Sequence, residues 1–494
     1  MKFYKYFYET SNYHVPDFQE KWEKALSSSE ELRVGMELLN KIHSLFPQKE
    51  IYIVGGVPRD IIMGNAIDDV DMATNIPFSS LSEHFPLRNI SKNDSQPVYT
   101  ILYKNYNFDL AKFREDSKTV GRGNNVSKET DSFEKDTERR DITINSFGID
   151  YKGRIVDYQN GLKDLRDKIV RAVGNPKERF LEDATRILRV FRFAAKMGFS
   201  LDEETRKAAV ELKHLLTDRS AISMESISKE LYKVAKSGKA LAKFLEDLEE
   251  NGILESILPE FTTMRGFMHN PKHHPEGGSS VLGHILECLK VSPYTDPVTN
   301  LAVLFHDFGK AVTRGEKNGF STYYGHEAAG VPVVENIFSR LRFSELGAED
   351  KKNILAAVGK HMLVHQLDSL GIKALTDLIT SPTWETVKAV GYCDEASRGA
   401  PLFDKKEFQE KIKRAEDKVH KLVGGNLKRE EMRQVIKKYV DGNKLLSWFP
   451  EIKSNIKIMK HILSHLEEYI LKSLEKDVEP SEEELKKEAK SFMK

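Results

Sequence analysis

The sequence predicts an α+β protein in which a small mixed-sheet domain precedes an all-α remainder. Short β-branched and aromatic runs such as Ile51–Val54 and Val98–Tyr103 occur before about residue 158 and read as strands. A further strand-like run, Tyr106–Ala111, follows Val98–Tyr103 after Lys104-Asn105, which predicts a hairpin. From residue 176 onward the chain is mostly helical in pattern, and its 31% charged residues fit this. At 494 residues the chain is too long for one core. We expect a helical extension (1–46), a mixed-sheet head (47–175), a helical neck (176–265), a further helical domain (266–400) and a helical tail (401–494).

The composition excludes some classes of protein. The 76 basic and 76 acidic residues cancel, so any nucleic-acid surface must be local. Cys288 and Cys393 have neither metal-site spacing nor a disulfide framework, which fits a reducing, intracellular setting. No apolar run approaches the roughly 20 residues that span a bilayer, and the N-terminus lacks a signal-peptide core. We expect a cytoplasmic protein without a membrane partner.

The head is organised around the stretch from Ile51 to Thr74. A predicted strand ends at Gly55 and Gly56, and a predicted helix follows Arg59. Paired glycines let the backbone approach a bulky anion, and a helix N-terminus offers free N–H groups to a phosphate. A lone glycine pair is more often an ordinary turn, so it predicts a phosphate site only in combination with the motif that follows.

Two aspartates follow at a spacing of two residues. Asp69 and Asp71 share a face if they lie on a strand, and their mutual repulsion favours a cation between them. Mg²⁺ suits carboxylate and phosphate oxygens, and two such ions would clamp both oxygens of a phosphoryl transfer. A lone pair of this kind is usually a solvated loop. Its place soon after the glycine turn favours the catalytic interpretation.

The pattern GG-x-x-RD-x-x-x-G followed by DxD-x-A-T resembles the class II tRNA nucleotidyltransferases, which are the CCA-adding enzymes and the bacterial poly(A) polymerases. Pro58 stands where the family usually has valine, and a helix's first turn tolerates it. The resemblance implies a nucleotidyltransferase head with Mg²⁺ at Asp69 and Asp71. It also implies a third acidic residue, for which Asp109 is the candidate, although a surface strand aspartate is nearly as plausible. The implied nucleotide-binding residues here are Gly55, Gly56, Arg59 and Asp60.

Arg139 to Asn145 resembles the family's RRDxTxN motif. Arg140 would bridge phosphate oxygens, while Asp141 and Asn145 would hold that arginine or meet the ribose. An ordinary surface salt bridge is the alternative. The preceding segment, Arg114 to Glu138, has no periodicity and reads as a loop. In the family a mobile loop here, which would include Arg122, helps switch the enzyme from adding C to adding A.

A second motif begins the neck. Asp183, Arg186, Arg189 and Arg192 step by three and should share one helical face. A carboxylate accepts from the amines of cytosine and adenine, and an arginine donates to ring atoms, so such a pair could select C and A. The resemblance to the family's EDxxR motif supports this role and implies nucleotide contacts for Arg189 and Arg192. The alternative is a charged helix face with a Glu182–Arg186 pair.

An apolar run that begins at Ala302 ends in His306-Asp307 and is followed by Gly309-Lys310. This pattern resembles the HD phosphohydrolase signature. Imidazole and carboxylate together suit a divalent transition metal of uncertain identity. We expect His326 and Lys310 at the edge of the site, and ordinary packing or surface roles for His361 and His365. The ligand set implied by the resemblance is His284, His306, Asp307 and Asp394.

The order of head, neck and HD domain resembles the bacterial CCA-adding enzymes that carry a C-terminal HD domain. This implies addition of CMP, CMP and AMP from CTP and ATP to a tRNA 3′ end, with release of pyrophosphate. It also implies hydrolysis of phosphomonoesters and 2′,3′-cyclic phosphates by the HD domain. The protein would be a monomer or homodimer. Two alternatives stay open: a poly(A) polymerase, or an HD phosphohydrolase whose head only binds tRNA, which the intact Asp69 and Asp71 disfavour.

The two ends carry weaker signals. Asp17 to Phe46 reads as an amphipathic helix that packs on the head or on a partner. The basic residues between Phe403 and Leu446 could follow a tRNA backbone or simply form a solvated face. Ser481 and Glu484 have the spacing of a capping box and predict a last short helix.

Overall fold

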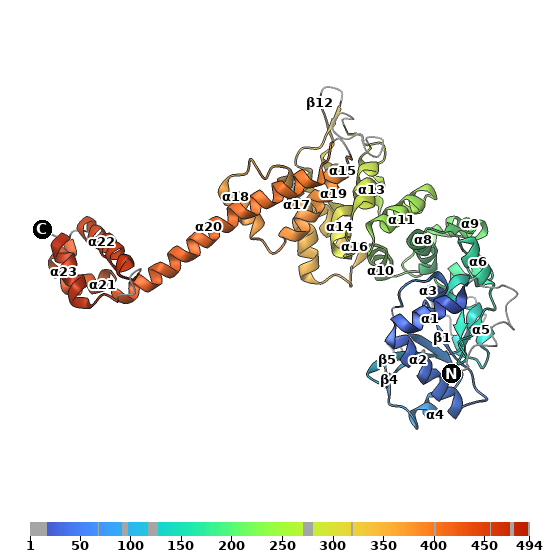
Figure 1. The fold of residues 1–494 in the computed structure, drawn as a ribbon. Coiled ribbons are helices and arrows are strands. Elements are labelled where there is room, and N and C mark those ends of the chain that lie inside the picture. Colours follow the sequence, from blue (N-terminus) through green and yellow to red (C-terminus); the bar gives the residue numbers. More distant parts are fainter. Residues whose placement is uncertain are drawn as a thin grey trace. The chain divides into compact units, whose positions relative to one another are not determined.

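A computed structural model describes residues 17–67, 69–90, 97–116, 127–269, 280–317, 320–399, 402–454, 456–474 and 479–492 (Figure 1). The chain forms two compact units. The first comprises residues 1–365 and 385–404, and the second comprises residues 366–384 and 405–494. The first unit contains the predicted mixed-sheet head followed by helices, and the second unit is helical.

The head is built on a seven-stranded sheet in the order β3-β4-β5-β2-β1-β8-β9. The β2 and β5 strands are parallel, and the other neighbours pair antiparallel. The predicted hairpin is confirmed, with β4 and β5 joined by Lys104 and Asn105, both at positive φ. The strands are β1 (Ile51–Val54), β2 (Asp71–Thr74), β3 (Leu87–Asn89), β4 (Val98–Tyr103), β5 (Tyr106–Lys112), β8 (Gly148–Ile149) and β9 (Ile155–Val156).

Helices cover the sheet through its apolar side chains. Gly35 of α2 (Glu30–Leu45) lies so close to the sheet that a Cβ there would come within 3.1 Å of Phe108 and 3.2 Å of Val70. Tyr52 of β1 and Phe133 of α5 (Phe133–Glu138) belong to one cluster of buried apolar side chains. The short helices α3 (Val57–Met63) and α4 (Phe78–Ser82) follow β1 and β2.

Two sequence predictions about the head need correction. The single helix expected from Asp17 to Phe46 is two helices, α1 (Phe18–Ser28) and α2. Ser29 between them is extended, and its side chain accepts from the Leu32 amide as an N-cap, which starts a new helix.

The segment from Arg114 to Glu138, expected to be a loop, contains the paired strands β6 (Arg114–Asp116) and β7 (Ser127–Glu129) and then α5. Ser132 caps α5 through the Lys135 amide. These elements are too short to show periodicity in the sequence. Arg122 lies outside the described residues.

The neck is helical, as predicted, and its helices pack on one another. The helix α8 packs against α10 and α11. A two-stranded parallel pair, β10 (Ile169–Val170) with β11 (Ser200–Leu201), joins the end of the head to this bundle. The head also contains η1 (Thr143–Asn145) and α6 (Gly161–Asp167). The elements of the neck are α7 (Pro176–Glu182), α8 (Thr185–Met197), α9 (Glu203–Glu211), η2 (Lys213–Leu216), α10 (Met224–Val234), α11 (Gly238–Glu250), η3 (Leu254–Ser256) and α12 (Pro259–Thr262).

In the remaining helical part of the first unit, α14 (Pro297–Phe305) packs against α13 and α17, and its residues from Val298 to Phe305 are all buried. A small antiparallel hairpin, β12 (Gly315–Lys317) with β13 (Phe320–Thr322), projects between two helices of this part (Figure 1). The helices are α13 (Val281–Val291), α14 (Pro297–Phe305), α15 (Lys310–Thr313), α16 (His326–Leu341), α17 (Ala348–His365) and α19 (Trp384–Ala396).

The second unit has its own apolar cluster, which includes Leu445, Leu466 and Leu485. The predicted capping box is confirmed, because the Ser481 hydroxyl accepts from the Glu484 amide and the Glu484 carboxylate accepts from the Ser481 amide at 2.8 Å. Among the described residues, no helix has the length and apolar character needed to cross a bilayer. The elements of the second unit are α18 (Ile372–Ile379), α20 (Lys405–Tyr439), α21 (Gly442–Trp448), η5 (Pro450–Ser454), α22 (Ile456–Leu474) and α23 (Glu482–Phe492).

Candidate functional site

Three carboxylates gather where β1, β2 and β5 lie side by side. Asp71 begins β2, opposite Val54 in the antiparallel pair. The parallel register that joins Met72 to Leu110 sets Asp71 beside Asp109 on the neighbouring strand. The Thr100 hydroxyl, across from Asp109 on β4, donates to its carboxylate at 2.7 Å.

The glycine turn lies directly over this group. Gly55 has φ of +76°, and a Cβ added there would lie 3.4 Å from Asp71 Oδ2. A side chain at this position would therefore be strained and would crowd the carboxylate. The turn ends at Gly56, and α3 starts at the next residue.

The strand expected to carry both aspartates is shorter than predicted. Since β2 starts at Asp71, Asp69 precedes the strand. Both aspartates are exposed while Val70 between them is buried, and Asp69 lies near enough for its charge to raise the pKa of Asp71.

The negative charges of the three carboxylates are only partly neutralised by nearby cationic side chains. Loss of water around the Asp71 carboxylate and, to a smaller extent, the negative charges of Asp109 and Asp69 together raise its pKa to about 6, even though the residue keeps solvent access. Arg140 opposes this shift. Carboxylate oxygens alone form the donor set, and this chemistry fits Mg²⁺.

The two arginines of the head motifs meet at Asn145. Arg59 is buried, forms a bidentate pair with Asp60 and donates to the Asn145 side-chain oxygen. Arg140 donates to the Asn145 backbone carbonyl at 3.1 Å and pairs with Asp136. The structure therefore joins the two distant motifs, and Asp136 is a partner that the sequence analysis did not identify.

The neck motif differs from the single helical face that we predicted. Asp183 lies between α7 and α8, where it caps the Thr185 amide, so it is not on the same helix as the arginines. Arg186 binds Glu182 at 2.7 Å and the Arg139 carbonyl at 2.9 Å. The Glu182–Arg186 pair, raised as the alternative, is thus present.

The next two arginines of α8 have different environments. Arg189 pairs with Asp141 at 2.6 Å and so ties the neck to the RRD motif. Burial would raise the pKa of Asp141, but Arg189 outweighs it and holds that pKa below its usual value. Arg192 is buried and bound to Glu230 of α10. Its burial favours a supporting role over the direct nucleotide contact that the resemblance implied.

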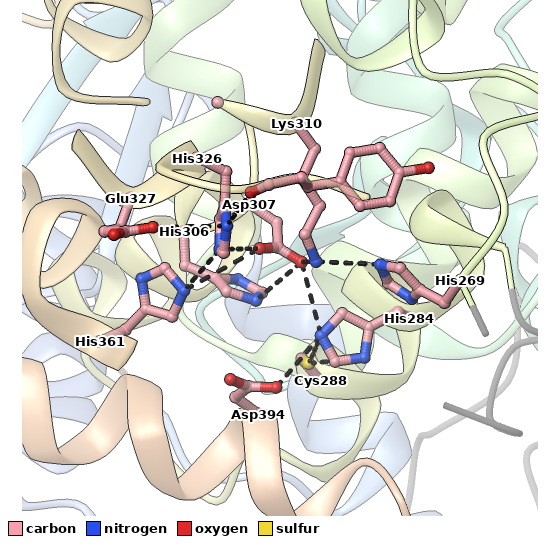
Figure 2. Close-up of polar contacts among 12 residues, drawn as sticks. His269, His284, Cys288, His306, Asp307, Lys310, His326, Glu327, His361 and Asp394 are labelled. Carbon is pink, nitrogen blue, oxygen red and sulfur yellow. Dashed lines mark hydrogen bonds and ion pairs between the residues drawn. The ribbon is translucent and has the colours of Figure 1, made fainter. Parts of the chain in front are cut away.

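A second polar cluster lies inside the helical part of the first unit (Figure 2). All four residues of the predicted ligand set come together there. His284 Nε2 is 3.3 Å from Asp394 Oδ1 and 3.6 Å from Asp307 Oδ2, and His306 Nε2 is 3.4 Å from Asp307 Oδ2. These side chains come from α13, the end of α14 and α19, and each residue is at most 5% exposed.

Neighbouring side chains stabilise the ionised form of Asp307 in this cluster. Burial alone would raise the pKa of Asp307, but Lys310 and His306 outweigh it and hold that pKa well below its ordinary value. Lys310 Nζ lies 2.5 Å from Asp307 Oδ2 and forms a buried ion pair with it. His306 Nε2 is buried and has no hydrogen-bond partner among the described residues. A buried nitrogen of this kind, facing carboxylates, fits a transition-metal site.

The sequence analysis missed several members of this cluster. His361, expected to be an ordinary packing or surface residue, is fully buried beside Asp307 and His306. His365 binds Asp394 Oδ2 at 2.6 Å, which raises the pKa of His365 to about 9 against the opposing effect of burial. Cys288, one turn after His284, has its thiol 3.5 Å from His284 Nε2. The four-residue spacings in the sequence were the available signal.

Two family models match the chain. Residues 51–171 match the poly A polymerase head domain, and residues 198–264 match the probable RNA and SrmB-binding site of polymerase A. The multifunctional CCA protein of Teredinibacter turnerae is 31% identical over 346 residues, which cover 66% of this chain and 77% of that protein. The CCA-adding enzyme of Bacillus licheniformis is 32% identical over 213 residues, but the match spans only 51% of its length and 42% of this chain.

Solved structures share the fold. The CCA-adding enzyme of Bacillus stearothermophilus, solved with CTP, superimposes with a TM-score of 0.59 at 20% identity and covers 94% of this chain and 98% of that one. A tRNA nucleotidyltransferase solved with a primer tRNA and an ATP analogue gives a TM-score of 0.51 at 20% identity, covering 78% and 99%. At these identities the likeness concerns the fold.

Proposed function

The chain belongs to the family of the CCA-adding tRNA nucleotidyltransferases, and from that premise we propose that it adds CMP, CMP and AMP to the 3′ end of tRNA. The observation that carries the proposal is the carboxylate group of Asp69, Asp71 and Asp109 beside the turn at Gly55. In each addition the 3′-hydroxyl oxygen bonds to the α-phosphorus of CTP or ATP. The bond to the β-phosphate oxygen breaks, and pyrophosphate leaves.

The chain's own residues divide the work of the head. Asp69 and Asp71 would hold Mg²⁺, with Asp109 beside them, and bound Mg²⁺ supplies charge neutralisation for the triphosphate and activation of the hydroxyl. The turn at Gly55 and Gly56 leaves backbone room for the triphosphate. The arrangement of Arg59 and Arg140 around Asn145 would fix both guanidinium groups before the nucleotide arrives.

Base selection is proposed for the head–neck junction. Asp183 is exposed, and its carboxylate can accept from the amine of cytosine or adenine. Arg186 is fixed by Glu182 and the Arg139 carbonyl, and it can use its remaining N–H groups on the base. The two side chains come from consecutive segments, so they need not share a helix to face one base.

Incorporation assays test this proposal. Purified protein and a tRNA lacking its CCA end are incubated with each labelled nucleotide in turn. We expect CMP incorporation from CTP alone, and then AMP once the two C residues are in place. Asp69→Ala and Asp71→Ala should each lower the rate at least 1,000-fold, while the exposed Asp131→Ala should not. Continued incorporation by either site variant would contradict the proposal.

The same assay distinguishes the poly(A) polymerase alternative, which the name of the matching head model also covers. A poly(A) polymerase would leave the RNA unchanged with CTP alone and would add a run of A residues with ATP. A protein whose head only binds tRNA would incorporate neither nucleotide.

A second function is supported by the buried cluster. We propose that His284, His306, Asp307 and Asp394 hold a divalent transition metal and that this site hydrolyses phosphomonoesters and 2′,3′-cyclic phosphates of RNA ends. Two observations support the metal. His306 Nε2 is buried without a hydrogen-bond partner among the described residues, and atoms of His284, His306 and Asp394 lie close enough together to hold one ion. The relative from Teredinibacter turnerae is called multifunctional, which is consistent with a second activity.

Hydrolysis of 4-nitrophenyl phosphate after supplementation with Mn²⁺, Ni²⁺, Co²⁺ or Zn²⁺ tests the second function. His306→Ala should lose phosphatase activity and keep CMP incorporation, whereas Asp71→Ala should do the reverse. If His306→Ala lost incorporation as well, the two sites would not be separate as proposed.

A further inference from the structure

The thiol of Cys288 lies inside the buried cluster, although the predicted ligand set does not include it. Cys288 is one turn after His284 on α13, and its side chain is fully buried. Figure 2 shows its sulfur beside His284 and Asp394. One possible ligand atom from each of His284, Cys288, His306 and Asp394 lies within 4.8 Å of those of the other three, and all four residues are buried.

The two imidazole rings turn their lone pairs toward this group. Nδ1 of His306 lies 2.7 Å from the Val303 carbonyl, which only accepts, so the hydrogen of the neutral ring is on Nδ1. Nδ1 of His284 lies 3.4 Å from the Ser397 hydroxyl oxygen, and that hydroxyl donates to the Asp394 carbonyl. This ring therefore donates from Nδ1 as well. Contacts of this kind orient metal-binding histidines, with Nε2 left for the metal.

The spacing of the facing atoms fits a tetrahedral ion. Metal bonds of about 2.0–2.1 Å to nitrogen or oxygen and about 2.3 Å to sulfur separate a nitrogen from a sulfur by about 3.6 Å and from an oxygen by about 3.4 Å. Cys288 Sγ is 3.5 Å from His284 Nε2, and that nitrogen is 3.3 Å from Asp394 Oδ1. The buried Nε2 of His306 has no hydrogen-bond partner among the described residues and completes the group.

We propose that Cys288 is a thiolate ligand of the metal in this cluster, together with His284, His306 and Asp394. When the ion binds, the S–H bond breaks, the proton is released to the solvent, and the sulfur electron pair forms the bond to the ion. In the metal-free protein the thiol hydrogen can instead be shared with His284 Nε2, which accounts for their contact without a metal.

The proposal changes the expected role of Asp307. Its Oδ2 is bound to Lys310, and its Oδ1 faces His326 and His361. A cationic side chain thus balances its charge, whereas the group with Cys288 has no lysine or arginine among its four members. Four protein ligands fill a tetrahedron, so a phosphate oxygen would add as a fifth ligand, a number that zinc reaches in catalysis.

A thiolate would decide which ion the cluster takes. Thiolate and imidazole ligands favour Zn²⁺, whereas Mn²⁺ and Mg²⁺ prefer carboxylate, carbonyl and water oxygens. The inference deepens the proposed hydrolysis of phosphate esters and rests on that proposal for the presence of a metal. It makes Cys288 the residue that determines the metal specificity of the hydrolytic site.

The absorption spectrum of the Co²⁺-loaded full chain tests the inference. The chain has two cysteines, so a sulfur-to-cobalt charge-transfer band in the near ultraviolet can come only from Cys288 or Cys393. We expect this band in the natural chain and in Cys393→Ser, which removes a buried thiol outside the ligand group, and we expect its loss in Cys288→Ser. Circular dichroism melting checks that both variants are folded.

Competition measures the metal preference on the same sample. Zn²⁺ should abolish the cobalt band at one equivalent, and Mn²⁺ in roughly tenfold excess should leave it. Cys288→Ser should lower the affinity for Zn²⁺ by at least about 10- to 100-fold, since removing even an outer contact of a metal ligand has an effect of this size. Displacement of Co²⁺ by Mn²⁺ as readily as by Zn²⁺ would contradict the role in specificity.

X-ray absorption at the zinc edge gives a second measurement that needs no cysteine variant. The protein carries Asp69→Asn and Asp71→Asn, so that the head does not contribute metal. One sulfur neighbour at about 2.3 Å from zinc is expected. Bound zinc with only nitrogen and oxygen neighbours, or a cobalt band that survives Cys288→Ser, would overturn the thiolate ligand.

These outcomes are separable from the fate of the proposed functions. Zinc without a sulfur neighbour would leave the hydrolytic metal site in place, and hydrolysis of 4-nitrophenyl phosphate with Mn²⁺ would still test its activity. If neither Co²⁺ nor Zn²⁺ bound, both the thiolate ligand and the metal site would be overturned. CMP incorporation by the chain with its natural aspartates would decide the function of the head independently.

Discussion

At the scale of single residues, the ionised Asp71 carboxylate lowers the stability of the head when no cation neutralises it. Its pKa is raised to about 6 because the carboxylate is withdrawn from water and lies near Asp109 and Asp69. In the unfolded chain the pKa would return to its ordinary value near 4. The ionised Asp71 therefore destabilises the metal-free fold at neutral pH, and protonation relieves this as the pH falls through about 6.

Asp71→Asn should accordingly stabilise the protein while it abolishes incorporation. Without Mg²⁺ we expect the free energy of unfolding to rise by about 1 kcal/mol at pH 7, since solvent access moderates the shift. The gain should decrease as the pH falls from about 6 to about 4, so it should be smaller at pH 5 than at pH 7, because the carboxyl of the folded wild-type protein is mostly protonated at pH 5. Urea unfolding at the two pH values measures this. The exposed Asp131→Asn is the control, and an equal gain at both pH values would contradict the explanation.

The buried pair of Arg192 and Glu230 is the second residue-scale feature. Both side chains are nearly inaccessible, and Lys233 also binds Glu230. Breaking such a pair leaves an uncompensated buried charge. This cost makes Arg192 a support for α8, the helix that carries Arg186 and Arg189.

Glu230→Gln should lower the free energy of unfolding by about 3 kcal/mol, because it leaves Arg192 buried without its counter-charge. The matched control is Glu203→Gln, which breaks the exposed pair with Arg206 and should change the free energy of unfolding far less. Urea denaturation of the purified variants gives both values. Equal small losses would mean that the buried pair does not hold α8 in place.

At the scale of elements, the start of α15 lies against the start of α16. A Cβ on Gly309 would come within 1.9 Å of the His326 carbonyl oxygen and 2.6 Å of the Gly330 amide nitrogen. The φ of Gly309 is an ordinary −64°, so glycine is needed here for space and not for backbone freedom. This close approach places Lys310 and His326 on either side of Asp307.

Gly309→Ala should therefore separate the two helices. We expect a loss of about 3 kcal/mol in the free energy of unfolding together with reduced metal retention by the cluster. Gly371→Ala is the control, since no atom lies within 4 Å of an added Cβ there. Thermal unfolding and metal analysis provide the readouts. If Gly309→Ala behaved like the control, the contact would not position the cluster.

At the scale of the whole molecule, each compact unit has its own core. Leu245 is fully buried in α11 of the first unit, and Leu466 is fully buried in the apolar cluster of the second. Units with separate cores can unfold in separate steps.

Leu466→Ala and Leu245→Ala should consequently affect different calorimetric transitions. Each creates a cavity worth about 2–5 kcal/mol, but only in its own unit. We expect Leu466→Ala to lower the transition of the second unit and to leave the rate of CMP incorporation within twofold. Differential scanning calorimetry measures both variants. A common shift of one transition would show that the two units unfold together.

Local signals made much of this architecture predictable. The strand before Gly55, the hairpin at Lys104 and Asn105 and the capping box at Ser481 depend on residues that are close in sequence, so their physical causes can be read from the chain. The break at Ser29 and the short strands β6 and β7 were missed. A single capping hydrogen bond or a pairing of three residues leaves little periodicity.

By itself the sequence determined the two chemical sets: aspartates beside a glycine turn, and histidines with aspartates in a helical domain. Only the tertiary structure decided which residues meet. It joined Arg59 to Asn145, turned Arg192 away to Glu230 and brought His326 and His361 to the free side of Asp307. These contacts connect residues at least 19 positions apart, and packing of whole helices fixes them, so no local pattern could specify them.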